Sequence, residues 1–161
     1  MSLSPRVRVF AVAALCAVVL ATLGRWATQL GPWYAALAKP PWQPPDFWFG
    51  PVWTLIYTLS VWSAAGAWLA TDEQRQRRAL VVAWAVNMVL NLLWSWLFFT
   101  RQRPDWAQLE VVALWLSVLA VMVVTWRISR LHGALLLPYL AWVAFAAVLN
   151  RAIVQLNPIA G

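Results

Sequence analysis

The chain is poor in charge, cysteine and histidine, and each shortage excludes a class of protein. Charged residues make up 11% of the 161 residues, whereas a typical soluble domain has about 25%, so a soluble enzyme of the usual kind is excluded. A single Cys excludes a disulfide framework, and one Cys with one His argues against a metal site. Hydrophobic residues make up 63%, which excludes intrinsic disorder.

Long apolar blocks take the place of a charged surface. A membrane-spanning helix needs about 20 apolar residues. Blocks that reach or approach this length run from about Val7 to Leu23 (with an extension toward Leu30 left open), Phe47 to Thr71, Ala79 to Thr100, Ala107 to Trp126 and Leu131 to Asn150. They lack strict polar–apolar alternation, which favours helices over barrel strands. We predict an all-α, single-domain bundle of five transmembrane helices over residues 1–161, with its termini on opposite faces of the membrane.

The first block has an alternative interpretation as a signal peptide, because Arg6 and Arg8 precede its apolar run. No clear small-x-small cleavage site follows, and Leu15 before Cys16 is unlike a lipoprotein signal. A transmembrane helix is therefore the preferred interpretation.

The basic residues lie between the apolar blocks. A net charge of +7 would suggest nucleic acid in a soluble protein, but here it indicates charge at the membrane edges, and no nucleic-acid partner is expected. Seven of the 12 Lys and Arg residues fall on the predicted N-terminal side and five on the other. This asymmetry favours an N-terminus inside the cell.

One connection is long. The segments TDEQRQRR (71–78), RQRPD (101–105) and RISRLH (127–132) read as tight polar turns between antiparallel neighbours. The segment 30–46 is longer, and Pro32 can start a short helix within it that reaches Lys39. Its later prolines, Pro40, Pro41, Pro44 and Pro45, predict an extended and rigid path. We expect an ordered lid over one mouth of the bundle, with Asp46 at the N-terminus of the second long helix.

Two asparagines interrupt the third block. Asn87 and Asn91 are four residues apart and share one helix face. Amides in hydrocarbon need partners. The Asn87 and Asn91 amides either form hydrogen bonds between helices or provide the polar lining of a mostly apolar pocket. The two hypotheses are compatible.

The chain has 14 Trp residues. Trp26, Trp48, Trp106 and Trp126 fall near predicted helix ends, where an aromatic belt is expected. Trp53, Trp94 and Trp142 fall deeper, on stripes that also carry Tyr or Asn. These rings either fill the core or stack on a planar apolar ligand.

Three stretches of the sequence together resemble those of a known protein family. They are WYAALAKPPWQPPDFWFGPVWTLIY (Trp33 to Tyr57), NLLWSWLFF (Asn91 to Phe99) and PYLAWVAFAAVLN (Pro138 to Asn150). In this order and spacing they resemble the TspO/MBR family, the tryptophan-rich sensory proteins of bacteria and the translocator protein of mitochondria. The resemblance implies five transmembrane helices, pairing as a homodimer, and a ligand cavity beneath the first loop.

The resemblance also implies a ligand, protoporphyrin IX or haem, or another apolar small molecule, without a required cofactor. Carried over by position, the implied pocket residues are Tyr34, Pro44, Trp53, Tyr57, Asn87, Asn91, Trp94, Trp142 and Ala146. Lys39 is the nearest cation in the sequence for a porphyrin carboxylate, and Arg25 is the second.

Catalysis is not expected, since no constellation of nucleophile, base and acid is visible. The first alternative function is light-dependent porphyrin breakdown, in which the resemblance implicates Trp53 and Trp142. The second is transport of a small molecule or lipid, ranked low because charged residues are missing from the predicted midplanes.

One departure from the animal members concerns sterol. Arg151 stands where their cholesterol motif has Tyr, and Gln155 where it has Arg, so sterol recognition by that motif is not expected. Eleven Arg against one Lys indicate a GC-rich bacterium. We expect a bacterial cell membrane, the inner rather than the outer, although the sequence does not decide between them.

Overall fold

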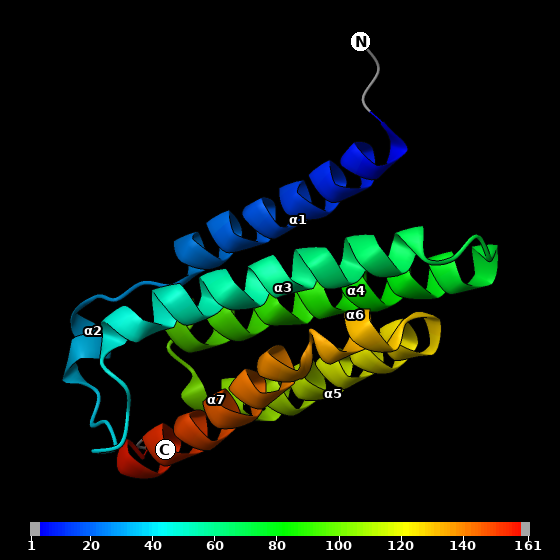
Figure 1. Ribbon diagram of the computed structural model, residues 1–161. Coiled ribbons are helices and arrows are strands. Elements are labelled where there is room, and N and C mark those ends of the chain that lie inside the picture. Colours follow the sequence, from blue (N-terminus) through cyan, green and yellow to red (C-terminus); the bar gives the residue numbers. More distant parts are fainter. Residues whose placement is uncertain (1–3, 159–161) are drawn as a thin grey trace.

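The computed structural model describes residues 4–158, which form helices joined by short connections (Figure 1). Five helical segments are long and apolar enough to cross a membrane, and each overlaps one predicted block. They are Pro5–Ala27, Asp46–Leu69, Gln74–Thr100, Pro104–Ile128 and Arg130–Leu156. The all-α fold with five spans is therefore confirmed. The first and last described residues lie at opposite ends of the bundle (Figure 1).

Prolines mark several of the helix starts. In chain order the helices are α1 (Pro5–Ala27), α2 (Pro32–Ala36), η1 (Asp46–Trp48), α3 (Phe49–Leu69), α4 (Gln74–Ser95), η2 (Trp96–Thr100), α5 (Pro104–Ile128), α6 (Arg130–Ala134) and α7 (Leu137–Leu156). Pro5, Pro32 and Pro104 are the first residues of their helices. At this position the backbone N–H makes no hydrogen bond within the helix, so its absence in proline costs nothing. The fifth span is broken between α6 and α7, and Pro138 lies in the first turn of α7, where its missing N–H costs no helical bond.

The polar connections are shorter than predicted. The residues from Gln74 to Arg78 belong to α4, and Ser129 alone separates α5 from α6. Gln and Arg are good helix formers, and at a helix end their side chains can reach water. The polar segments marked the breaks between the spans correctly, but the helix ends predicted from them were wrong.

A buried apolar core lies between α3, α5 and α7. Its fully buried members include Ile56, Val111, Val118 and Val143, and Leu136 joins them from the break before α7. The strongest helix contacts are those of α5 with α4 and α7, and of α1 with α3. Toward its N-terminal end α1 diverges from α3 (Figure 1), and Leu20 is its only buried residue among those described.

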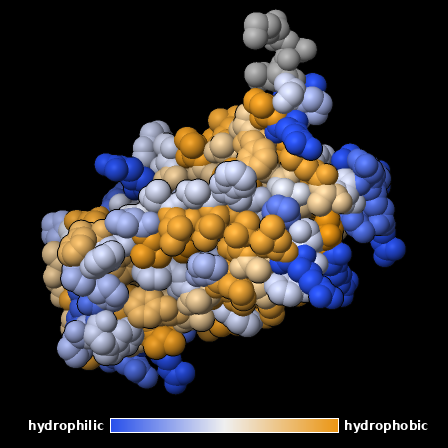
Figure 2. Space-filling view, in the orientation of Figure 1, coloured by the Kyte–Doolittle hydropathy of each residue, from blue (hydrophilic) through white to orange (hydrophobic). Residues whose placement is uncertain are grey.

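The outer surface is that of a membrane protein. Figure 2 shows a broad apolar band with hydrophilic residues gathered toward the two ends of the bundle. The belt residues Trp26, Trp48, Trp106 and Trp126 are all exposed. Such a surface is costly in water and is solvated by lipid. The chain is therefore an integral membrane protein.

Candidate functional site

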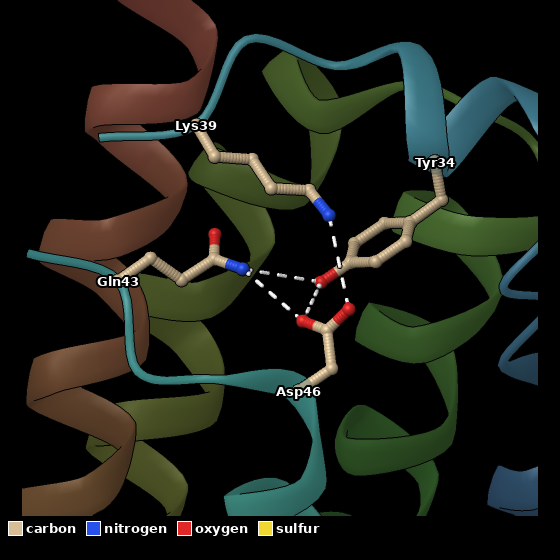
Figure 3. Close-up of polar contacts among 4 residues, drawn as sticks. All are labelled: Tyr34, Lys39, Gln43 and Asp46. Atoms are coloured by element: carbon tan, nitrogen blue, oxygen red, sulfur yellow. Dashed lines mark hydrogen bonds and ion pairs between the residues drawn. The ribbon is translucent and has the colours of Figure 1, made fainter. Parts of the chain in front are cut away.

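Four residues of the loop between α1 and α3 form a polar cluster (Figure 3). The Tyr34 hydroxyl donates to Asp46 Oδ1 at 2.9 Å, and Gln43 Nε2 donates to that same oxygen at 3.2 Å. Lys39 Nζ lies 3.8 Å from Asp46 Oδ2 and 3.7 Å from the centroid of the Tyr34 ring. The cluster holds the two halves of the loop together.

The chemistry of the cluster depends on a protonated Tyr34. Burial of the phenol, and then its hydrogen bond to Asp46, raise the pKa of Tyr34 above its ordinary value. The phenol therefore stays a donor to the carboxylate at neutral pH. Lys39 is already engaged by Asp46 and the Tyr34 ring, so it could meet a ligand carboxylate only by exchanging its present partner.

The loop is also attached to the helices beneath it. Trp33 meets Phe98 edge-on at 5.9 Å between ring centroids, and Trp42 meets Phe145 at 6.0 Å. The helix α2 begins at Pro32 as predicted, although it ends at Ala36 rather than Lys39. The aromatic residues of the loop are therefore packed onto η2 and α7.

A turn of π-helix positions the rings at the end of the third span. In η2 the Arg101 N–H donates to the Trp96 carbonyl at 2.8 Å, five residues back. Gln102 then adopts a φ of 54° and turns the chain into α5. The extra residue in the turn leaves Phe98 buried and stacked on Trp94, with 5.3 Å between centroids. Such π-turns are frequent at functional sites.

The three deep tryptophans come from three helices and pack against the same core. Trp53 of α3, Trp94 of α4 and Trp142 of α7 are each partly buried on the core formed by α3, α5 and α7. Trp53 stacks on Tyr57 at 5.3 Å between centroids. Trp142 meets Phe49 at 5.6 Å and Phe145 at 5.3 Å. We call this set of rings the aromatic cluster.

Asn87 and Asn91 are both buried and bonded across helices. Asn87 Nδ2 donates to Ser117 Oγ of α5 at 2.9 Å, and Asn91 Nδ2 donates to the Tyr139 hydroxyl of α7 at 3.0 Å. The Tyr139 hydroxyl in turn donates to Asn87 Oδ1 at 3.2 Å. The amides thus act as bonds between helices, the first of the two hypotheses for this pair.

A partly open cavity of about 510 Å³ lies between α1, α3 and α4. Arg8 lies at one end, by the start of α1, and Tyr57, Asn87 and Tyr139 line it near the middle of the bundle. Its lining is otherwise almost entirely apolar. Asn87 therefore both bonds its neighbours and lines a cavity, whereas Asn91 bonds Tyr139 and is not part of the cavity lining.

The comparisons with known proteins agree with this architecture. The sequence model of the TspO/MBR family matches residues 11–156. The chain belongs to the TspO/MBR family. It is 38% identical to the tryptophan-rich protein TspO of Chlorobaculum tepidum over 126 residues, 78% of this chain and 80% of that protein. It is 34% identical to the tryptophan-rich sensory protein of Cereibacter sphaeroides over 125 residues, 78% and 77% of the two chains. The human translocator protein is 30% identical over 122 residues, 75% and 72% of the two chains.

The family-derived pocket residues do not all lie in one place. Tyr57 and Asn87 line the cavity between α1, α3 and α4. Tyr34, Lys39 and Pro44 lie in the loop, and Trp53, Trp94 and Trp142 lie in the aromatic cluster. Asn91 bonds Tyr139, and Ala146 is half-buried on α7. Because Trp53 stacks on Tyr57, the aromatic cluster and the cavity share a boundary at that ring pair.

Several polar residues of this family member were not singled out from its sequence. Ser117 and Tyr139 complete the asparagine network, and the i,i+4 spacing of Asn87 and Asn91 could have prompted a search for their partners. Asn157 contacts the loop from the end of α7. Glu110 has both carboxylate oxygens buried with no hydrogen-bond partner in residues 4–158. It was overlooked because it lies in the second turn of α5, near the edge of a predicted span.

Proposed function

We propose that the protein binds a tetrapyrrole, protoporphyrin IX or haem, within a bacterial inner membrane, and acts as a sensor, regulator or carrier of that ligand. The observation that carries the proposal is the aromatic cluster: indoles from three helices on one core, beneath a loop that is itself tied down. Flat apolar rings suit stacked indoles. The printed name of the Cereibacter sphaeroides relative, a tryptophan-rich sensory protein, supports the sensory role.

In this proposal the ring lies between α3, α4 and α7, against Trp53 and Trp142. Tyr57 at the boundary with the cavity supplies a hydroxyl for polar ring atoms. The Asn87 amide is bonded to Ser117 and Tyr139, so it meets the ring only by exchanging one of these partners. The propionate carboxylates point toward the loop, because they are costly to bury in hydrocarbon. Lys39, and after it Arg25, are the cations that we propose for the carboxylates. Lys39 reaches them by leaving Asp46, an exchange between partly exposed charges that costs little.

The test is a titration of purified protein with protoporphyrin IX, followed by tryptophan fluorescence quenching. Trp142→Phe should weaken binding, while Trp126→Phe, at an exposed belt position, should not. Lys39→Ala should weaken porphyrin binding more than binding of an uncharged apolar ligand. If Trp142→Phe and Lys39→Ala both bind porphyrin as the parent does, the deep tryptophans are core residues and the proposal fails.

The same titration separates binding from the alternative of light-dependent breakdown. Porphyrin absorbance is followed in the dark and under illumination in air. A sensor or carrier leaves the absorbance unchanged under both conditions, apart from the bleaching of free porphyrin. Light-driven loss that is suppressed by Trp142→Phe would favour the enzyme instead. A carrier is distinguished from a sensor by porphyrin movement between vesicles that contain the protein, an activity that the name of the human translocator protein suggests.

A further inference from the structure

The cavity between α1, α3 and α4 reaches well beyond the residues that the proposed tetrapyrrole site uses. It runs along α1 from Arg8 to Leu20, a rise of about 18 Å for a helix. The hydrocarbon of one leaflet is roughly 15 Å deep, half of a bilayer core. The cavity is thus about as long as the acyl tail of one lipid, and it lies on the side of the membrane where α1 begins.

Small side chains create this space. Ala13 and Ala17 of α1 face Ala64 and Ala65 of α3 across the cavity, and α1 diverges from α3 toward its N-terminal end (Figure 1). A void in contact with lipid loses dispersion contacts on every wall unless something fills it. The apolar lining excludes a polar occupant, since polar groups there would find few partners.

The positive charge of Arg8, at the end of the cavity where α1 begins, favours a lipid with an anionic headgroup. Arg8 lines the cavity at the end where α1 begins, and no acidic side chain of residues 4–158 forms an ion pair with it. Hydrophilic residues gather at this right-hand end of the molecule (Figure 2). At its inner end the cavity meets Tyr139 and Asn87, whose polar groups already bond each other, so an alkyl chain can end there without leaving them unpaired.

We propose that this cavity is a binding site for one anionic phospholipid of the leaflet in which α1 begins, with its phosphate at Arg8 and one acyl chain between α1 and the α3–α4 pair. The site takes a different ligand and meets the proposed tetrapyrrole site only at its inner end, at Tyr57 and Asn87. It accounts for the divergence of the N-terminal part of α1 from α3, since the lipid chain supplies there the contacts that a neighbouring helix would otherwise make (Figure 1).

The test is native mass spectrometry of the protein released from nanodiscs that contain phosphatidylglycerol and phosphatidylcholine with the same chains. The parent should retain phosphatidylglycerol preferentially. Arg8→Gln should reduce that preference about five-fold, the factor expected for one cation near an anionic membrane surface. Arg6→Gln, on the same turn of α1 but outside the cavity lining, is the matched control and should keep the preference.

A second pair of variants tests the cavity itself. Ala13→Leu fills it, whereas Ala14→Leu adds the same atoms at an exposed neighbouring position. Only Ala13→Leu should lower the retained lipid, and it should leave protoporphyrin IX binding unchanged. The proposal is overturned if the parent retains both lipids equally. It is also overturned if the two arginine variants have equal effects, or if the two leucine variants do. Loss of porphyrin binding in Ala13→Leu would also overturn it, by assigning the cavity to the porphyrin.

Discussion

The side-chain amide of Asn157 pairs with the backbone of Ala38, 119 residues earlier in the chain. Its Oδ1 accepts from the Ala38 N–H at 2.9 Å, and its Nδ2 donates to the Ala38 carbonyl at 2.9 Å. Nδ2 also donates to the Ile153 carbonyl within α7 at 2.8 Å. The end of the last helix therefore holds the loop that covers the aromatic cluster, at the point where the loop leaves α2.

Replacing Asn157 should loosen the loop and leave the bundle intact. Asn157→Ala removes two hydrogen bonds to Ala38, worth about 1 kcal/mol each. We expect faster hydrogen exchange and faster proteolysis within residues 30–46, with unchanged helical content. Asn157→Asp keeps the acceptor for the Ala38 N–H but loses the donor, and it should give an intermediate effect. If the loop exchanges as slowly in Asn157→Ala as in the parent, other contacts hold it.

The polar cluster of the loop should make stability sensitive to high pH. The folded protein keeps the Tyr34 proton above pH 10, where an unfolded tyrosine loses it, because the pKa of Tyr34 is raised by burial and by Asp46. The stabilisation is complete below pH 10 and is lost as the pH rises further. Thermal unfolding in detergent should therefore show a steeper loss of stability above pH 10 for the parent than for Tyr34→Phe. Parallel curves would mean that the phenol is not held as a donor.

The close contact between α3 and α6 gives a third prediction. A Cβ atom on Gly66 would overlap His132 Nε2, because the imidazole ring occupies the space that a side chain would need. Gly66→Ala should lower the stability by about 1–3 kcal/mol through overpacking. Gly24→Ala is the control, because no heavy atom outside its own helix lies within 4 Å of the added Cβ.

A double variant shows whether the ring is the cause. His132 Nδ1 lies 2.8 Å from Ser129 Oγ, a contact that the ring would lose by moving aside. In Gly66→Ala/His132→Ala the clash is absent, so the double variant should lose less stability than the sum of the two single changes. Additive losses would show that the ring already moves freely.

The sequence was sufficient for the fold because spans in lipid require long apolar helices, and these are visible in composition alone. Helix ends were less accessible: Gln74 to Arg78 looked like a turn, yet they form the first turns of α4. The sequence predicted that the Asn87 amide would bond another helix, but it did not identify the partners. Ser117 and Tyr139 lie on other helices, and only helix packing brings them near Asn87.

The cavity was harder still to foresee. It depends on the divergence of α1 from α3 (Figure 1), and small residues such as Ala13 and Ala64 are equally compatible with close helix packing. In this protein those small residues line an open space. A pattern of small residues gives the room available between helices but not the angle at which they cross.

The last prediction concerns Glu110. Glu110 of α5 lies level with Trp94 of α4. The two helices are antiparallel, and Asn87 of α4 is bonded to Ser117 of α5. Trp94 follows Asn87 by seven residues and Glu110 precedes Ser117 by seven, so both lie the same distance further toward the loop. The Trp94 indole N–H, like the Glu110 carboxylate, is buried without a hydrogen-bond partner in the described part of the chain. An ionised carboxylate in such a place is costly.

Replacing that carboxyl group by an amide should therefore do no harm. Glu110→Gln keeps the shape of the side chain, and we expect its thermal unfolding temperature in detergent to equal or exceed that of the parent. Asp105→Asn is the contrasting change on the same helix, because Asp105 is paired with Arg103 at 2.8 Å and also favours the N-terminus of α5. That variant should lose about 0.5 kcal/mol. A marked loss of stability in Glu110→Gln, larger than in Asp105→Asn, would show that the carboxylate has a charged partner in the membrane.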